Sequence, residues 1–245
     1  MFVIEPNGQS LRKLYSMLRR RFGFLNWWPA ETKDEMVIGA VLTQNTSWKN
    51  VEKAIANLKR AKKLSLKALA QDSSKEIMPL IKPSGFYKQK AERLHALASY
   101  LILNYGSLRG FFKKSKNPRG ELLAVKGIGR ETADSILLYA GNLPVFVVDA
   151  YTRRILGRFF GKDYSKVSYD ALQAMLQNEL KGSALLYQDF HAQIVELAKH
   201  YCKKQPLCSN CPLVSNCAFA STSKTNNSDI LHTTKGRGLP KHNRV

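Results

Sequence analysis

The sequence is short of acidic residues. Its 245 residues include 39 lysines and arginines but only 18 aspartates and glutamates, so the formal net charge is +21. So large a positive excess favours a polyanionic partner, and nucleic acid fits better than a small metabolite. An anionic membrane is the alternative, but no apolar run approaches the roughly 20 residues that span a bilayer. The first ten residues also lack a secretory signal pattern. We therefore expect a soluble cytoplasmic protein, associated with the nucleoid if the source is a prokaryote.

Cysteine is also scarce, and its few positions are clustered. The four cysteines lie within one short stretch, at Cys202, Cys208, Cys211 and Cys217. A disulfide framework would instead spread its cysteines over distant loops. Four neighbouring thiolates can close around Zn²⁺ or a [4Fe–4S] cluster. The spacing therefore predicts a metal site.

Sequence typical of β-strands is almost absent. Only residues 145–148 resemble a strand, and they are too few and too isolated to imply a sheet. Apolar residues recur at helical spacing along most of the chain. Helices are predicted over residues 10–22, 33–42, 48–60, 66–70, 74–81, 88–105, 108–114, 119–125, 132–141, 149–160, 170–180 and 187–201. We therefore predict an all-α fold, followed by a polar, basic and disordered tail over residues 221–245.

A glycine turn, Gly127-Ile128-Gly129, lies between two of the predicted helices. Glycines let the backbone turn sharply and approach a ligand closely. The free amides at a helix start suit a phosphate group, and Lys126 and Arg130 add positive charge. An ordinary interhelical loop is the alternative. The two flanking helices favour a helix-hairpin-helix, which grips the DNA backbone without reading base sequence.

Several stretches, taken in order, resemble the endonuclease III-like DNA glycosylases of the helix-hairpin-helix superfamily. They are residues 42–44 (Leu-Thr-Gln), 85–87 (Gly-Phe-Tyr), 90–91 (Lys-Ala), 126–133 with the glycine turn, 148–149 (Val-Asp) and the cysteine cluster. The resemblance covers roughly residues 10–220. It implies two helical domains with an active site in the cleft between them, and double-stranded DNA as the partner of a monomer.

The resemblance also implies how the chain divides. Residues 30–143 would form a helical barrel that contains the hairpin. Residues 1–29 and 144–220 would form a discontinuous second domain that carries the cysteine loop. The single loop with one central Cys-x2-Cys pair fits the family's structural [4Fe–4S] site, with zinc as the alternative. One departure is the first gap, which has five residues where the commonest family spacing has six.

The same resemblance implies roles for two acidic residues. Asp149 matches the family's catalytic aspartate, although a lone Asp before a helix is more often an N-cap. A fixed carboxylate stabilises the positive charge that develops on the sugar when an N-glycosidic bond breaks. Glu131 occupies the position where lyase members carry a Schiff-base lysine. We therefore predict a glycosylase without AP lyase activity, in which Glu131 assists catalysis or only supplies a favourable charge to the first helical turn.

The aromatic residues suggest a substrate. Trp27, Trp28 and Trp48 can stack on a flipped, cationic base such as 3-methyladenine, although tryptophans often pack in a core. Gln44 and Phe86 match positions where the family inserts side chains into the duplex. The alternatives are a capping glutamine and a core phenylalanine.

Together these features predict a base-excision DNA glycosylase that acts on alkylated purines, closest to the 3-methyladenine branch. An endonuclease III-type glycosylase and lyase that acts on oxidised pyrimidines is the second reading. A DNA-binding module without catalysis is the third. A purely structural helical protein ranks last, because it would need neither the clustered thiols nor the glycine hairpin.

Overall fold

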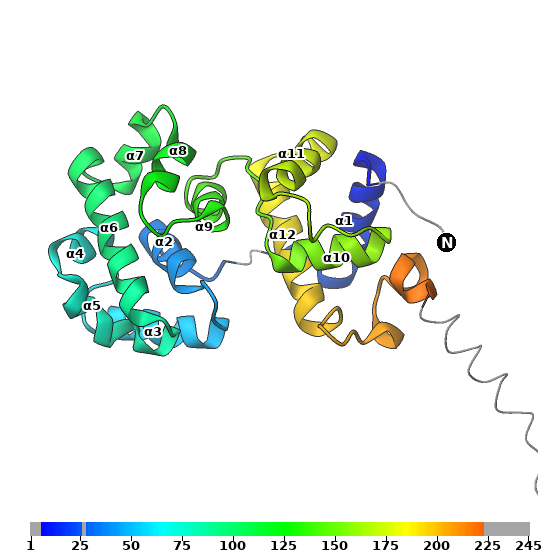
Figure 1. The fold of residues 1–245 in the computed structure, drawn as a ribbon, viewed down its shortest axis with the longest axis horizontal. Helices are drawn as coiled ribbons and strands as arrows, with labels where there is room; N and C mark the ends of the chain where they lie inside the picture. The colour runs from blue at the N-terminus through cyan, green and yellow to red at the C-terminus, as the bar shows by residue number, and fades with distance from the viewer. Residues whose placement is uncertain (1–5, 26–27, 223–245) are drawn as a thin grey trace, which may run out of the picture. The chain divides into compact units, whose positions relative to one another are not determined.

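The chain folds almost entirely into helices (Figure 1). The structure, a computed structural model, describes residues 6–25 and 28–222. The helices are α1 (Gly8–Phe22), α2 (Lys33–Leu42), α3 (Trp48–Arg60), α4 (Leu66–Gln71), α5 (Ser74–Ile81), α6 (Tyr87–Tyr105), α7 (Leu108–Lys114), α8 (Pro118–Ala124), α9 (Arg130–Ser135), α10 (Ala150–Phe160), α11 (Tyr169–Leu180) and α12 (Ala184–His200). A π-helical turn, Ile136–Ala140, continues α9. No strand occurs within the described residues, which confirms the predicted all-α class. Trp27 and residues 223–245 lie outside the described residues.

The chain divides into two compact units. The larger unit consists of Phe24–Asp149 and Tyr169–Ala192, and the smaller contains the described residues 6–23, 150–168 and 193–222. Residues 169–192 therefore group with the hairpin, whereas the sequence analysis placed them with the cysteine loop. Within the described ranges, no helix is long and apolar enough to cross a membrane.

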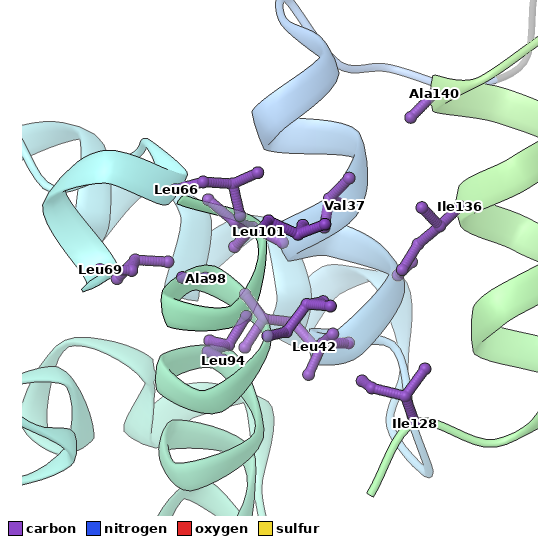
Figure 2. Packing of buried hydrophobic residues seen from close by; sticks show 14 of the residues in the cluster. Val37, Leu42, Leu66, Leu69, Leu94, Ala98, Leu101, Ile128, Ile136 and Ala140 are labelled. Atoms are coloured by element: carbon purple, nitrogen blue, oxygen red, sulfur yellow. The ribbon is translucent and has the colours of Figure 1, made fainter. Parts of the chain in front are cut away.

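The core of the larger unit is built around α2 and α6 (Figure 2). Every residue of α2 from Val37 to Leu42 is buried, as expected for a helix that is apolar on all sides. In α6 the buried apolar residues follow helical spacing, including Leu94, Ala98 and Leu101. α6 packs against α4, α5 and α7, and its buried residues form part of the core. α2 ends at Leu42, and the loop that follows it carries Gln44.

The hairpin is fixed to this core by its central residue. Pro118 occupies the first turn of α8, where its missing N–H costs nothing. Ile128 is only 4% exposed, and it belongs to the apolar cluster that also contains Leu42 and Ile136 (Figure 2). The glycines on either side of Ile128 stay exposed. Burial of one apolar side chain thus presents the two glycines to solvent.

Candidate active site

The segment that leads to Asp149 is extended but belongs to no sheet among the described residues. Its backbone groups bind side chains of α11 instead: Phe146 N donates to Gln177 Oε1 (2.8 Å), Phe146 O accepts from Gln173 Nε2 (2.7 Å), and Val148 N donates to the Tyr169 hydroxyl (3.3 Å). Buried backbone groups need such partners when no neighbouring strand supplies them. α11 therefore fixes the chain immediately before Asp149.

A buried ion pair supports the same region from α8. Arg119 donates two hydrogen bonds to Asp134, from Nε to Oδ1 at 2.8 Å and from Nη2 to Oδ2 at 3.0 Å. Asp134 is fully buried, and Gln173 donates to it as well, at 2.7 Å. Because Gln173 also binds Phe146 O, the hairpin helix and the segment before Asp149 share one hydrogen-bonded network.

Asp149 lies beside a histidine and a tyrosine. Its Oδ2 is 3.4 Å from His191 Nε2, and the two side chains are 13% and 6% exposed. On the other side of the ring, His191 Nδ1 is 2.7 Å from the Tyr139 hydroxyl. Burial, together with the charges of Asp149 and Asp189, raises the pKa of Tyr139 well above its ordinary value. The Tyr139 hydroxyl therefore stays protonated.

Glu131 is electrostatically coupled to Asp149. Crowding by protein atoms raises the pKa of Glu131, the charge of Asp149 raises it further, and His191 opposes the shift. Glu131 nevertheless keeps an exposed surface at the start of α9. The structure thus brings together the two acids that the sequence singled out, 18 positions apart, and a carboxyl with a raised pKa can hold or release a proton closer to neutral pH.

Two of the predicted tryptophans are in contact, and Trp28 also contacts Tyr139, the partner of His191. Trp28 lies edge-on to Trp48, with ring centroids 6.0 Å apart, and its ring centroid is 4.7 Å from that of Tyr139. Trp28 lies close to Gly39 of α2, since an added Cβ there would be 3.6 Å from the indole Nε1, an ordinary van der Waals contact. Both tryptophans are half-buried against the core. A continuous row of rings therefore runs from Trp48 through Trp28 and Tyr139 to His191.

A buried lysine ties two loops together. Lys90 of α6 is fully buried, and its Nζ donates to Leu42 O at 2.9 Å and to Ser84 O at 2.7 Å. Burial, and secondarily the charge of Arg93, lowers the pKa of Lys90 to about 8. One ammonium group thus joins the loop after α2 to the loop before α6.

These two loops carry Gln44 and Phe86. The Gln44 amide donates to Thr132 Oγ1 at 2.9 Å, and its oxygen accepts from Arg93. Phe86 is 62% exposed, so the core alternative for this residue is wrong. Its φ of +46° follows a φ of +68° at Gly85, a left-handed turn that is unfavourable for a residue with a side chain. This turn holds an aromatic ring in solvent.

The remaining hairpin residues lie at the surface. Lys126, Gly127, Gly129 and Arg130 are exposed. Gly127 has a φ of +85°, and a Cβ there would come within 2.5 Å of Arg93. At Gly129 the backbone φ is −88° and a Cβ would meet nothing within 4 Å of protein. Only Gly127 is therefore required by the fold itself.

Arg130 is not an isolated cation. Its Nε donates to Asp170 of α11 at 2.7 Å, and Asp170 also accepts from Arg119. Both members of the Arg130 pair are about half exposed. The pair orients the guanidinium at the surface of the hairpin, and solvent screens its charge.

The four cysteines belong to the smaller unit. Cys202, Cys208, Cys211 and Cys217 all line one small cavity, and each is half-buried. Burial raises the pKa of Cys211 and Cys217, and the other cysteines contribute to both shifts. The Arg158 guanidinium lies 3.3 Å from Cys202 Sγ. The residues therefore fit a group with several thiolate ligands, although no described set of three or more metal-ligating side chains is arranged to hold a single metal ion.

Sequence reasoning missed three residues of this arrangement. Tyr139 and His191 were counted only as parts of amphipathic helices, and Lys90 only as part of a family-like pair. Each is a polar side chain on an otherwise buried helix face, which is the signal that could have identified it.

Known proteins are similar to this chain over most of its length. A family model described as "HhH-GPD superfamily base excision DNA repair protein" matches residues 38–179. A candidate DNA repair glycosylase of Methanocaldococcus jannaschii is 45% identical over 84% of this chain and 94% of its own. Endonuclease III of Thermotoga maritima is 31% identical over 71% of this chain and 76% of its own.

Solved structures share the fold. The H. pylori 3-methyladenine DNA glycosylase bound to 1,N6-ethenoadenine superposes with a TM-score of 0.69 at 34% identity, covering 78% of this chain and 96% of that one. A non-covalent endonuclease III–DNA complex has a TM-score of 0.76 at 21% identity, with 90% and 100% covered, and it supports the fold alone.

The helical fold, with a hairpin ahead of a lone aspartate, defines the class as helical DNA-repair glycosylases. Within that class, the chain belongs to the HhH-GPD superfamily of base excision DNA repair proteins. The resemblance drawn from the sequence motifs is thereby confirmed.

Proposed function

We propose that the protein is a monofunctional DNA glycosylase that hydrolyses the N-glycosidic bond of an alkylated purine such as 3-methyladenine. The observation that carries the proposal is the row of rings that ends at Asp149, with Glu131 where a lyase carries lysine. A cationic base gains from stacking on electron-rich rings. Such a base is already a good leaving group, so the site needs an aromatic slot and an anion rather than a strong acid.

In this proposal the flipped base stacks near Trp28 and Trp48, and Asp149 faces the sugar. The carboxylate stabilises the positive charge that develops as the glycosidic bond lengthens, and it orients or deprotonates the attacking water. Trp27 would join the base pocket, although it lies outside the described residues. Glu131 assists from the hairpin side, and it cannot form a Schiff base with the sugar.

Duplex DNA would be held by the exposed parts of the same unit. The phosphate backbone would be contacted by four hairpin residues, Lys126, Gly127, Gly129 and Arg130. Backbone amides and cations in such contacts fix the position of the protein on the duplex without reading the base sequence. The exposed Phe86 ring supports a role in filling the gap that a flipped base leaves. Gln44, on the adjoining loop, would act beside Phe86 after exchanging its protein contacts for DNA.

The cysteine loop would hold a [4Fe–4S] cluster through its four thiolates. A single zinc ion draws four sulfur atoms within about 2.3 Å of itself, whereas the larger cluster holds them farther apart. The single loop with one central Cys-x2-Cys pair, whose four thiols line one cavity, supports the cluster over zinc. The bound cluster would act as a structural cross-link. Elemental analysis of brown purified protein should give iron, and colourless protein with zinc would contradict this assignment.

Base release from methylated duplex DNA tests the proposed reaction. The parent protein should release 3-methyladenine, and Asp149→Asn should lower the single-turnover rate by about 10²- to 10³-fold, the range expected for losing one electrostatic stabiliser. Asp163→Asn changes an exposed aspartate of the smaller unit and should leave the rate unchanged. Release of thymine glycol instead would favour the oxidised-pyrimidine reading. Tight DNA binding with no release of either base would favour a non-catalytic module.

Borohydride reduction tests the absence of lyase activity. A Schiff-base intermediate would be trapped as a covalent protein–DNA adduct. We expect no adduct on damaged or abasic duplex, and products that are intact abasic strands. A robust adduct would refute the assignment of Glu131 as the reason for monofunctional chemistry.

A further inference from the structure

His191 and Tyr139 have no role in the reaction described so far, yet they lie next to its central acid. His191 Nε2 is 3.4 Å from Asp149 Oδ2, and His191 Nδ1 is 2.7 Å from the Tyr139 hydroxyl. The histidine and the tyrosine are both buried. Two buried polar groups, the Tyr139 hydroxyl and the His191 ring, therefore form a row that leads to the carboxylate.

The Tyr139 hydroxyl is the hydrogen-bonding partner of His191 Nδ1. It remains protonated because burial raises the pKa of Tyr139 well above its ordinary value. Its contact to His191 Nδ1 is 2.7 Å, whereas its contact to Gln188 O is 3.4 Å. When the hydroxyl donates across this shorter contact, Nδ1 accepts and a neutral ring carries its proton on Nε2.

The other tautomer would be unfavourable. It would direct the Nε2 lone pair at the Asp149 carboxylate, two acceptors facing each other across 3.4 Å. With the proton on Nε2, the N–H instead points toward the carboxylate. The separation is longer than an ordinary hydrogen bond, as is common for catalytic contacts before substrate binds.

We infer that His191 is a positioning residue for Asp149, and that Tyr139 sets its tautomer by donating to Nδ1. The inference rests on the proposed function. A neutral imidazole N–H holds the carboxylate in one orientation, so the position of its oxygen atoms is fixed before the glycosidic bond begins to break. An imidazolium would also hold the carboxylate, but it would cancel the charge that the sugar needs.

The tautomer can be measured without any substrate. Long-range ¹H–¹⁵N spectra of labelled full-length protein at pH 7.5 distinguish Nδ1–H, Nε2–H and doubly protonated rings. The chain has only five histidines, and the signal missing from His191→Gln identifies the residue. We expect Nε2–H in the parent and a mixture of tautomers in Tyr139→Phe. A doubly protonated or Nδ1–H ring in the parent would overturn the inference.

Single-turnover base release measures the effect on the reaction. His191→Leu should slow release by about 10- to 100-fold, the range for losing a hydrogen bond to a charged group. Its Kd for duplex containing a tetrahydrofuran abasic analogue should stay within twofold of the parent. His191→Gln should recover most of the rate, because its side-chain amide can donate where Nε2–H does.

The outcomes separate this inference from the proposed function. If the parent releases no base, the proposed function fails, and the spectra still decide the tautomer. If the parent is active and His191→Leu is equally fast, the positioning role is wrong. If His191→Leu and His191→Gln both lose rate and abasic-site affinity together, His191 is a packing residue and the inference is overturned. If His191→Leu does not fold, Tyr139→Phe, which removes only one oxygen atom, provides the same test of the positioning role.

Discussion

Replacing Lys90 with methionine would test whether one buried ammonium group holds two loops in place. Methionine matches the lysine side chain as far as Cε but lacks the ammonium group that donates to Leu42 O and Ser84 O. Leaving two buried carbonyls without a partner costs about 1–3 kcal/mol each. Removing the ammonium group also has a favourable effect, because a buried charge no longer has to be desolvated. The fall of the Lys90 pKa from 10.5 to about 8 corresponds to at most about 3 kcal/mol for this effect, before solvent screening. The two carbonyls together cost about 2–6 kcal/mol, so the balance at pH 7.5 leaves Lys90→Met between about equal in stability to the parent and about 3 kcal/mol less stable.

The pH dependence gives the sharper test. Between the folded pKa of about 8 and the unfolded value of 10.5, the unfolded chain binds more protons at Lys90 than the folded chain does. Folding stability from this group therefore rises with pH across that window, and methionine lacks the effect. The stability difference between the parent and Lys90→Met should widen by about 1–2 kcal/mol from pH 7.5 to pH 9.5.

Urea denaturation at the two pH values measures both quantities. Lys88→Met is the matched control, because Lys88 is an exposed residue two positions before Lys90 on α6. Its free energy of unfolding should stay within about 0.5 kcal/mol of the parent value at either pH. A stability difference that stays constant or narrows as pH rises would refute the reasoning.

Three further predictions follow from the larger unit. Gly127→Ala should destabilise the fold by about 1 kcal/mol or more in urea, because φ is +85° and the new Cβ would displace Arg93; an unchanged stability would contradict the strain argument. Arg119→Met should cost about 3–5 kcal/mol, since it strips the buried Asp134 carboxylate of its cation, and a loss below 1 kcal/mol would show that water reaches that carboxylate. Lys126→Gln should reduce the slope of log K against log salt for duplex DNA by about 1, and an unchanged slope would remove Lys126 from the phosphate contacts.

Helix positions were predictable from the sequence because their cause is local. Apolar spacing, capping residues and breaking glycines act within a few residues, and every predicted helix lies within three residues of an observed one at each end. The glycine hairpin was predictable for the same reason. So was the absence of a sheet, since residues 145–148 have no neighbouring strand within the described chain.

The surroundings of Asp149 could not be read from the sequence. The contact between Tyr139 and His191 joins residues 52 positions apart, and Lys90 reaches Leu42 O across 48 positions. Sequence alone gives no sign of which polar residue on a buried face meets which partner, because that choice depends on how helices pack. The exposure of Phe86 likewise follows from a left-handed turn, which the Gly85 signal permits but does not require.

The sequence by itself determined that this is a basic, helical protein with a hairpin, one acid after it and a glutamate where a lysine could stand. Periodicity and turn chemistry are properties of neighbouring residues, so they survive without coordinates. Only the tertiary structure decided that rings from three distant helical segments line up beside that acid, and that a lysine fastens two loops. Those arrangements arise from side-chain packing and from the need to pair buried polar groups, which act between residues that the chain order keeps far apart.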